Sequence, residues 1–339
     1  MNLITGATGL IGAHVALQLL QQGKPVTAIR RADSDITKTR QLFSYYTAEY
    51  DLLFDRIRWV DADITDIYSI LDALEGIDHV YHCAGFVSFD AKDREQMHRV
   101  NATGTANMVN ACLEKPVKAF CHVSSIATLQ NPDITTNISE SISWKSSPEA
   151  SDYAISKYNG EREVWRGMEE GLQAVIVNPG LVLGPGFWDQ SSGRLISTCY
   201  KGSAFYTSGS SAAISATDTA ACMIALTEKR LFGQRFILTA HNYTFRELLS
   251  ELHVAFGKKA PSIEAGKAML RLGLWLDALR SAITGNKRVL TKATMYAGLA
   301  KNTYNNSRVK DALHYNFASL QETIRFVCSL YLKEQKSHA

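Results

Sequence analysis

The stretch that decides the fold is Thr5-Gly6-Ala7-Thr8-Gly9-Leu10-Ile11-Gly12, which joins an apolar segment to a helical pattern over residues 9–22. Gly6 permits a tight turn, Gly9 lets the backbone approach a pyrophosphate, and Gly12 lets helix and strand pack closely. The helix N-terminus then offers unsatisfied N–H groups and a positive dipole end to an anion. This context predicts a dinucleotide site that uses Gly6, Thr8, Gly9, Leu10, Ile11 and Gly12.

The first half of the chain alternates short apolar runs with helical patterns. The pattern predicts strands at residues 2–5, 25–30, 57–61, 78–83, 117–124 and 173–178. It predicts helices at residues 9–22, 34–55, 66–74, 92–114 and 153–170. Such alternation is typical of an α/β, doubly wound, parallel-sheet Rossmann fold with helices on both faces.

The pattern loosens after Pro179, where a Gly- and Ser-rich segment leads into a largely helical region, residues 244–335. Short strands are expected near residues 204–207 and 234–239, with helix 217–228 between them. We therefore predict a smaller, mainly helical C-terminal substrate lobe. The predicted boundaries are 1–180 and 216–240 for the Rossmann domain, 181–215 and 241–318 for the lobe, and 319–339 for a C-terminal helix and tail.

Composition excludes several classes of protein. The 339 residues carry a formal net charge of +3, which is too small to indicate nucleic-acid binding. The six cysteines form no CxxC pair and no zinc-like cluster, so neither a metal site nor disulfides are expected. No apolar run reaches the roughly 20 residues of a spanning helix, and no signal peptide precedes the first strand. These features favour a reducing cytoplasm.

The second predicted strand ends in two basic residues, Arg30 and Arg31. An NAD site usually has an acid at this position to hold the ribose, whereas a guanidinium suits a 2′-phosphate. NADP(H) is therefore favoured over NAD(H), with a solvated basic pair as the alternative. Later strand ends add five candidate cofactor residues: Asp63, Ile64, Cys83, Ala84 and Gly85.

The sequence Tyr153-Ala154-Ile155-Ser156-Lys157 opens a predicted helix. A spacing of four residues places Tyr153 and Lys157 on one face. A nearby ammonium is expected to lower the pKa of the tyrosine toward the working range, so that the phenol can donate a proton to a carbonyl oxygen. Lys157 can also hold the nicotinamide ribose.

These motifs, together with His82-Cys83-Ala84-Gly85, Val123-Ser124-Ser125-Ile126-Ala127 and Asn178-Pro179-Gly180, resemble the extended short-chain dehydrogenase/reductases, the NAD-dependent epimerase/dehydratase family. Within it the chain resembles dihydroflavonol-reductase-like, NADP-dependent carbonyl reductases. The resemblance implies that Ser125 binds the substrate oxygen and that Asn101 supports the lysine. It also implies a nicotinamide pocket formed by Pro179, Gly180, Leu181 and Val182.

Three features separate the subfamilies. Dehydratases of this family carry an acidic pair after the catalytic hydroxyl, whereas Ile126 and Ala127 follow Ser125. Epimerases often place an Arg in a stretch that corresponds here to residues 209–218, which contain none. Arg30 favours NADP(H), whereas epimerases usually retain NAD. All three favour net reduction of a ketone or aldehyde.

The expected substrate pocket is aromatic and mostly apolar. Its candidate residues are Phe86, Ser88, Phe187, Trp188, Arg194 and Tyr206, with Val87, Phe89 and Phe205 beside them. Arg194 is the best-placed charge for an acidic substrate group, with a solvated helix residue as the equal alternative. Several of the aromatic residues are also compatible with plain lobe core.

Residues 258–310 contain eleven Lys or Arg and two acids, Glu264 and Asp277, around the apolar run Met269–Leu279. This segment fits either a membrane surface or an anionic substrate. The favoured interpretation is a cap helix buried between the lobes, with basic residues on its solvated side. Membrane-surface contact stays open but is not favoured.

The predicted function is thus NADP(H)-dependent reduction of a small-molecule carbonyl substrate by a homodimer, with Tyr153 as general acid/base. The alternatives are a sugar-nucleotide epimerase with tightly bound NAD, a non-catalytic NADP-binding sensor and a membrane-associated sterol-type dehydrogenase. The Tyr153–Lys157 pair argues against the sensor, because such proteins commonly lose it.

Overall fold

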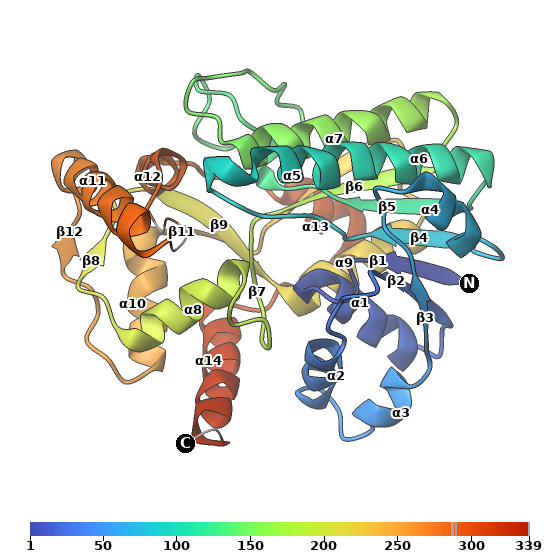
Figure 1. Ribbon diagram of the computed structural model, residues 1–339, viewed down its shortest axis with the longest axis horizontal. Helices are drawn as coiled ribbons and strands as arrows, with labels where there is room; N and C mark the ends of the chain where they lie inside the picture. Colours follow the sequence, from blue (N-terminus) through green and yellow to red (C-terminus); the bar gives the residue numbers. More distant parts are fainter. Residues whose placement is uncertain (286–287, 289, 338–339) are drawn as a thin grey trace.

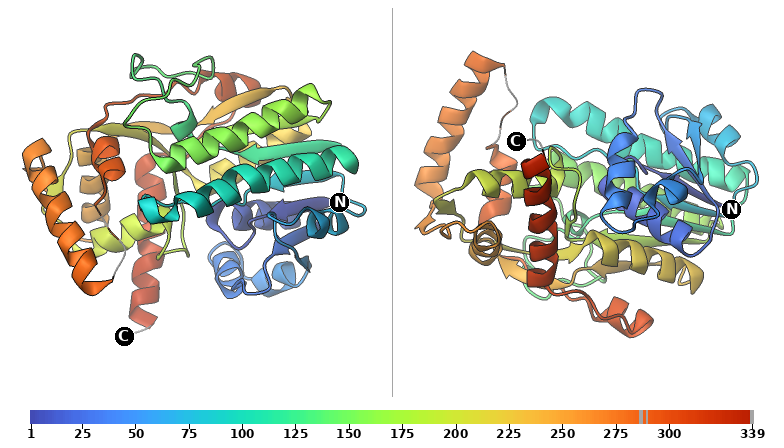
Figure 2. Two further views of the ribbon diagram at one scale, coloured as in Figure 1. Left: turned by 45° about the horizontal axis from the view of Figure 1, so that its top comes forward. Right: turned by 90° about the horizontal axis from the view of Figure 1, so that it is seen from below.

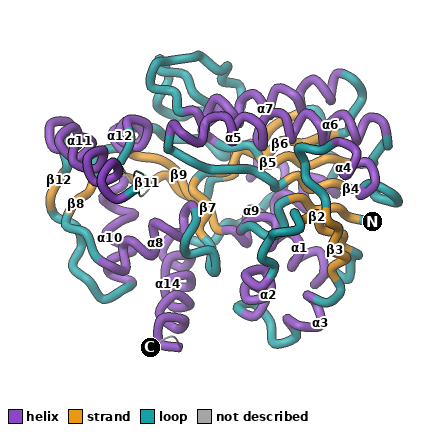
Figure 3. Tube along the Cα trace, viewed as in Figure 1, coloured by secondary structure: helices purple, strands orange, loops and turns teal. Residues whose placement is uncertain are grey.

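The computed structural model describes residues 1–285, 288 and 290–337. Its centre is a seven-stranded sheet in which all neighbouring strands are parallel. In spatial order the strands are β10 (Gln234–Leu238), β6 (Ala174–Pro179), β5 (Ala119–Val123), β4 (His79–His82), β1 (Asn2–Thr5), β2 (Val26–Arg30) and β3 (Ile57–Asp61). Figure 3 shows this sheet in orange between helices. The predicted doubly wound fold is confirmed.

The order of the strands reverses at β1. The chain continues from β1 to β2 and β3 on one side, and then crosses to β4, which pairs with the other side of β1. The loops after β1 and β4 therefore diverge at the carboxyl edge of the sheet. Such a switch point is where open α/β sheets bind ligands.

Helices cover both faces of the sheet (Figure 1). One face carries α1 (Leu10–Gln21), α2 (Thr37–Ser44), α3 (Tyr50–Phe54) and α9 (Ala216–Glu228), and the other carries α4 (Ile67–Ala73), α6 (Gly104–Glu114) and α7 (Asp152–Glu169). Successive strand residues point into the hydrophobic cores on opposite faces of the sheet. Ile4 packs on the α1 side and Leu3 on the α6 side, and neither has exposed surface. Burial on both faces explains why these strands consist of continuous apolar runs.

Two predicted helices differ in detail from the structure. Residues 34–55 form two short helices, α2 and α3, rather than one. The turn after α2 is held to α1 because the Tyr46 hydroxyl lies 2.8 Å from His14 Nε2. The predicted helix 92–114 contains α5 (Arg94–His98), a π-helical turn (Arg99–Thr103) and α6.

The smaller lobe contains two sheets that the sequence pattern only partly indicated. β7 (Leu181–Leu183), β9 (Ser210–Ser215) and β11 (His241–Thr244) form one, and β8 (Phe205–Tyr206) pairs with β12 (Ile263–Glu264) in the other. The expected strand near 204–207 is β8, whereas β9 was not anticipated. The helices of this region are α8 (Ser191–Lys201), α10 (Phe245–Ala255), α11 (Lys267–Thr284), α12 (Lys292–Leu299), α13 (Ser307–Leu313) and α14 (Leu320–Ser337).

Helix α14 helps to close the core of the smaller lobe. Its residues Ile324, Val327 and Tyr331 are buried in one cluster with residues of α8 and α10. Its carboxylate Glu334 accepts hydrogen bonds from the indole N–H of Trp188, at 2.8 Å, and from the hydroxyl of Tyr45. These contacts link α14 to the turn after α2.

Helix α11 contradicts the interpretation of a cap helix buried between the lobes. Only Leu270 is buried, where it packs with Met295 of α12, while most of the apolar side chains of α11 face outward. Figure 2 shows α11 in orange at the margin of the molecule in both views. In the part of the chain that the structure describes, no helix is both long and apolar enough to cross a membrane.

Candidate active site

The glycine turn lies against the end of β4, as the switch-point geometry predicts. A Cβ on Gly6, whose φ is +70°, would stand 2.7 Å from the backbone nitrogen of Ala84, and one on Gly12 would stand 2.3 Å from the carbonyl oxygen of Gly6. The Thr5 hydroxyl accepts a hydrogen bond from the Ala84 N–H at 3.1 Å. Only glycine fits this contact between the loop after β1 and the Cys83–Gly85 loop.

The N-terminus of α1 is suited to a pyrophosphate. Among the described residues, no side chain caps this helix at Gly9, so its first N–H groups, including those of Leu10 and Ile11, remain for an anion. A Cβ on Gly9 would be 3.4 Å from the Gly6 carbonyl, so the turn leaves room for close approach. The residues present therefore fit a dinucleotide, with Thr8 half-buried beside the turn.

The two arginines after β2 both have acidic neighbours. Arg30 Nε donates to Asp61 Oδ1 at 2.9 Å, and Asp61 stands opposite Arg30 in the register of β2 and β3. Arg31 Nε donates to Asp33 Oδ1 at 3.3 Å. Both pairs are solvent-exposed, so each contributes only about 0–1 kcal/mol to stability. The hydrogen bond to Asp61 involves only Nε of the Arg30 guanidinium. This contact orients the two outer nitrogens of the guanidinium, which remain for another partner.

Asp63 and Ile64 occupy less open positions than expected. Asp63 Oδ1 accepts hydrogen bonds from the N–H and hydroxyl of Thr65, at 2.8 and 2.9 Å. The side chain of Ile64 is 7% exposed and lies over Gly104 at the start of α6, where a Cβ would be 2.7 Å away. Ile64 thus packs in the core beneath the loop, and the half-buried Asp63 side chain orders the turn.

Helix α7 carries the expected pair at its N-terminus. Ser151 caps the helix through a hydrogen bond from the Ala154 N–H at 3.1 Å. Tyr153 lies in the first turn, and its hydroxyl lies near that of Ser125, which follows β5. Lys157 is 4% exposed, and its Nζ donates to the Val123 carbonyl at 2.7 Å. The structure therefore brings Ser125, Tyr153 and Lys157 to one strand end.

The electrostatics of this pair differ from the expectation. Burial raises the pKa of Tyr153, and the nearby Ser125 hydroxyl opposes that shift. The Lys157 ammonium is hydrogen-bonded to the Val123 carbonyl. Burial lowers the pKa of Lys157 to about 8, against the attraction of Glu161 and Cys83. Tyr153 is thus a protonated phenol at neutral pH, which suits a proton donor.

Asn101 is fully buried in the π-helical turn, and it positions the loop after β4. Its Oδ1 accepts from the Phe86 N–H at 2.8 Å, and its Nδ2 donates to the Phe86 carbonyl and to Ser156 Oγ, both at 2.9 Å. A Cβ on Gly85 would lie 3.3 Å from Asn101 Oδ1 and 3.8 Å from Lys157 Nζ. Asn101 therefore lies beside the lysine. A π-helical turn at a functional residue is a common arrangement.

A buried ionic network beneath the site escaped the sequence analysis. Glu161, one turn after Lys157 and 1% exposed, pairs with Arg235 of β10 at 2.8 Å. The Ser124 hydroxyl, Thr128 hydroxyl and Asn178 amide donate to the same carboxylate at 2.6, 2.8 and 2.9 Å. Burial raises the pKa of Glu161, but Arg235 and these donors hold it below its usual value. The feature of the sequence that could have indicated this network is Arg235, a charged residue within an apolar strand.

The segment after β6 passes close to the small sheet. A Cβ on Gly180 would stand 2.4 Å from the Ala212 carbonyl of β9, so only glycine fits there. Pro179 ends β6, and the next residues, Leu181 and Val182, are half-buried in β7. These four residues connect the two sheets next to the strand end that carries Ser125.

The residues proposed for the substrate pocket lie in different places, and the loop of residues 86–89 is the part that lies beside Tyr153. The ring of Phe89 is 6.2 Å from that of Tyr153, and Phe89 and Val87 are both exposed. Phe86 is half-buried, and Ser88 Oγ donates to Asp93 Oδ2 at 2.7 Å. The loop after β4 therefore offers an apolar surface at the proton donor.

The other residues proposed for the substrate pocket have contacts away from Tyr153. Phe187 is 3% exposed in the core on the α1 face, and Trp188 packs edge-on against Tyr331 of α14. Tyr206 lies under the guanidinium of Arg246, 5.3 Å from its ring centre. Arg194 is exposed on α8. Phe187 is thus a core residue rather than part of an open pocket, whereas Trp188 is half-buried and its place in the substrate pocket stays a prediction.

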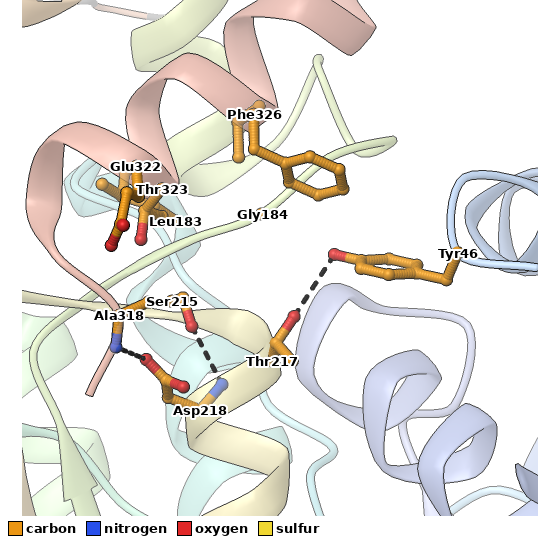
Figure 4. Close-up of a pocket in the computed structure, with 11 residues that line it drawn as sticks. Tyr46, Leu183, Gly184, Ser215, Thr217, Asp218, Ala318, Glu322, Thr323 and Phe326 are labelled. Atoms are coloured by element: carbon orange, nitrogen blue, oxygen red, sulfur yellow. Dashed lines mark hydrogen bonds between the residues drawn. The ribbon is translucent and has the colours of Figure 1, made fainter. Parts of the chain in front are cut away.

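A cavity between α9, α14 and the turn after α2 is separate from this constellation (Figure 4). Its wall includes Tyr46, Thr217, Asp218 and Phe326, and none of the three residues proposed for proton transfer lines it. Asp218 accepts hydrogen bonds from the Ala318 N–H and the Tyr315 hydroxyl. In the described residues there is also no cluster of His, Cys, Asp and Glu that would hold a metal ion.

Comparisons with known proteins agree with this geometry. The family described as the NAD dependent epimerase/dehydratase family matches residues 2–232. Sterol demethylase protein B of Methylococcus capsulatus is 30% identical over 269 residues, which cover 77% of this chain and 76% of that protein. A putative dihydroflavonol 4-reductase of Synechocystis is 29% identical over 272 residues, 76% of this chain and 73% of that protein.

Among solved structures, UDP-glucuronic acid 4-epimerase from Bacillus cereus, in complex with NAD, superposes with a TM-score of 0.74 at 19% identity. The superposition covers 100% of this chain and 98% of that one, which shows a shared fold. The chain belongs to the NAD-dependent epimerase/dehydratase family, the extended short-chain dehydrogenase/reductases. It is thus an NAD(P)-dependent enzyme of the oxidoreductase and epimerase class that acts on small molecules.

Proposed function

We propose that this enzyme reduces a ketone or aldehyde with NADPH, and that Tyr153 supplies the proton. The observation that carries the proposal is the convergence of Ser125, Tyr153 and Lys157 at the ends of β5 and α7. A phenol whose pKa is raised by burial is protonated at neutral pH and can donate to a developing alkoxide. The cofactor, when bound, supplies the hydride.

The proposed roles follow from the contacts. Ser125 and Tyr153, whose hydroxyls lie close together, donate to the substrate oxygen and stabilise its developing charge. Lys157, adjacent to Gly85, holds the ribose of the nicotinamide with its ammonium group. Asn101 acts as a positioning residue, because it fixes both the Phe86 backbone and Ser156.

NADP(H) is the proposed cofactor because Arg30 occupies the end of β2, where its outer guanidinium nitrogens can bind a 2′-phosphate. Arg31 adds a second positive charge at the same edge. The proposed dinucleotide site also contains the glycine turn and the Cys83–Gly85 loop. For the substrate, the exposed Phe89 beside Tyr153, with the exposed Val87 in the same loop, favours an apolar carbonyl compound over a sugar nucleotide.

The domain boundaries, the homodimer and the cytoplasmic location remain our expectations. In the proposed division, the returning segment 216–240 belongs to the Rossmann domain, because α9 packs on α1 and β10 pairs with β6. Light scattering of the purified protein measures the assembly.

The test is a rate measurement with purified protein, NADPH or NADH, and a panel of apolar and hydroxylated aldehydes and ketones. We expect turnover with NADPH, and faster rates for apolar carbonyl compounds. Denatured protein is also analysed for released nucleotide. Release of stoichiometric NAD without turnover would contradict the reductase and favour an epimerase that recycles its cofactor. NADPH binding without turnover of any substrate would favour the sensor.

A further inference from the structure

Helix α11 exposes a stripe of large apolar side chains to solvent. Six residues are between 44% and 75% exposed: Met269, Leu272, Trp275, Leu276, Leu279 and Ile283. At 100° per residue these six positions fall within an arc of about 120° on the helix surface. We call them the α11 stripe. Isolated exposed apolar residues are ordinary, but a contiguous row of six marks an interaction surface.

The stripe faces away from the rest of the protein. The opposite side of α11 carries Leu270, which packs with Met295, and Leu274, whose carbonyl accepts a hydrogen bond from Arg288 at 3.0 Å. Asp277 also lies on that side and accepts from the Leu290 N–H. The helix is thus attached along its inner face, and α11 itself lies at the margin of the molecule (Figure 2).

Positive charge borders the stripe on both sides. Arg271 is exposed on one edge, and Arg280 lies on the other. The single acid of α11, Asp277, is 12% exposed and is paired with Arg280 at 2.9 Å and Arg288 at 3.9 Å. The outward face of α11 is therefore apolar in the middle and basic at its borders.

We propose that α11 lies flat on an anionic phospholipid surface, with the stripe in the acyl region and the basic borders among the headgroups. Such a bilayer offers both an apolar interior and negative charge. Trp275 has the amphipathic ring that is enriched at membrane interfaces. A second copy of this chain is the poorer occupant, because pairing two stripes face to face would bring the like-charged borders together.

The test is flotation of the full-length protein with vesicles. One set contains equal parts of phosphatidylcholine and phosphatidylglycerol, and the other contains phosphatidylcholine alone. We expect binding to the anionic set that weakens with added salt, and a fall of roughly tenfold or more in the Leu272→Ser/Leu276→Ser variant. The matched control is Leu52→Ser/Val254→Ser, which removes two apolar side chains outside α11 that are somewhat more exposed, and this variant should bind as wild type.

Tryptophan fluorescence gives a second readout. Anionic vesicles should shift the emission to the blue, and Trp275→Phe should abolish the shift. Equal binding to neutral vesicles, or equal losses in the two double variants, would overturn the proposal. Absence of vesicle binding would overturn it as well. If the protein bound no vesicles but formed a dimer, and only the α11 double variant converted that dimer to monomer, the stripe would be covered by a second copy of this chain.

Discussion

Two regions of this enzyme depart from ordinary burial in opposite directions. Beneath the active site, Lys157 and Glu161 are charged groups that are almost fully buried, whereas on α11 the apolar residues Trp275 and Leu276 are more than half exposed. The buried charges have partners within the chain, namely the Val123 carbonyl and Arg235. For the exposed stripe no described residue provides a cover. The buried charges beneath the active site thus obtain their partners when the chain folds, whereas the α11 stripe would obtain its cover by binding to another surface.

The largest expected effect concerns the proton donor. Tyr153→Phe removes only the hydroxyl, and we expect kcat for carbonyl reduction to fall by about 10²–10⁴-fold, since a positioned general acid contributes that much. Steady-state rates with NADPH measure it. Tyr158→Phe is the control, because Tyr158 lies in the same helix as Tyr153 but its ring stacks on Trp144, with the ring centroids 4.6 Å apart. A Tyr153→Phe rate within about tenfold of wild type would remove Tyr153 from the mechanism.

The second prediction tests whether the buried charges are paired as the structure indicates. Glu161→Gln leaves Arg235, which is 13% exposed, without its counter-charge, and should lower the free energy of unfolding by about 3–5 kcal/mol. Adding Arg235→Met should recover part of that loss. Urea denaturation measures both.

The control for this prediction is Glu163→Gln, which disrupts an exposed pair with Arg166 and should cost less than about 1 kcal/mol. If the two Glu→Gln changes lowered the free energy of unfolding equally, burial of Glu161 would not make its ion pair with Arg235 more important for stability.

The same comparison shows what the sequence can predict. The glycine turn and the Tyr153–Lys157 pair were predictable because their geometry depends on spacings of a few residues. Glu161 was not, since its partner Arg235 is 74 positions away and the two meet only when β10 pairs with β6.

Phe187 was misplaced for the same reason, because local pattern cannot distinguish an aromatic residue that lines a pocket from one that packs in the core. The periodicity of α11 predicted a helix correctly. It did not reveal which side would face water, because an apolar arc describes a helix and not its partner.

The third prediction concerns cofactor choice. Arg30→Ala removes the guanidinium proposed for the 2′-phosphate, and should raise KM for NADPH by about 10–100-fold while leaving that for NADH nearly unchanged, since hydrogen bonds to charged groups contribute about 1.5–3 kcal/mol. Initial rates with both cofactors measure it. Arg31→Ala, one residue further along, is the comparison variant and should have the smaller effect. Similar changes with NADH and NADPH would show that Arg30 supports the strand end rather than the phosphate.

The fourth prediction uses the pKa of Lys157, which burial lowers to about 8. As pH rises through 8 the ammonium is lost, so kcat/KM for NADPH should fall roughly tenfold per pH unit. Lys157→Arg keeps its charge and should lack this decline. If kcat/KM of Lys157→Arg also declined above pH 8, the titrating group would be a residue other than Lys157.

The same shift has a consequence for stability. Since the folded protein releases this proton below the ordinary value of 10.5, the stability should rise between about pH 8 and 10.5 and be independent of this group below pH 8.

The smallest expected effect is on α11, and it tests whether the exposed stripe lies outside the folded core. Leu276→Gln changes an exposed side chain, so the free energy of unfolding in buffer without lipid should stay within about 0.5 kcal/mol of wild type. Leu270→Ala, on the opposite side of the helix, removes its buried contact with Met295 and should cost about 2 kcal/mol or more. Denaturation curves for the two variants measure the difference. If both cost the same, the stripe belongs to the folded core, and its exposure would need no partner outside the chain.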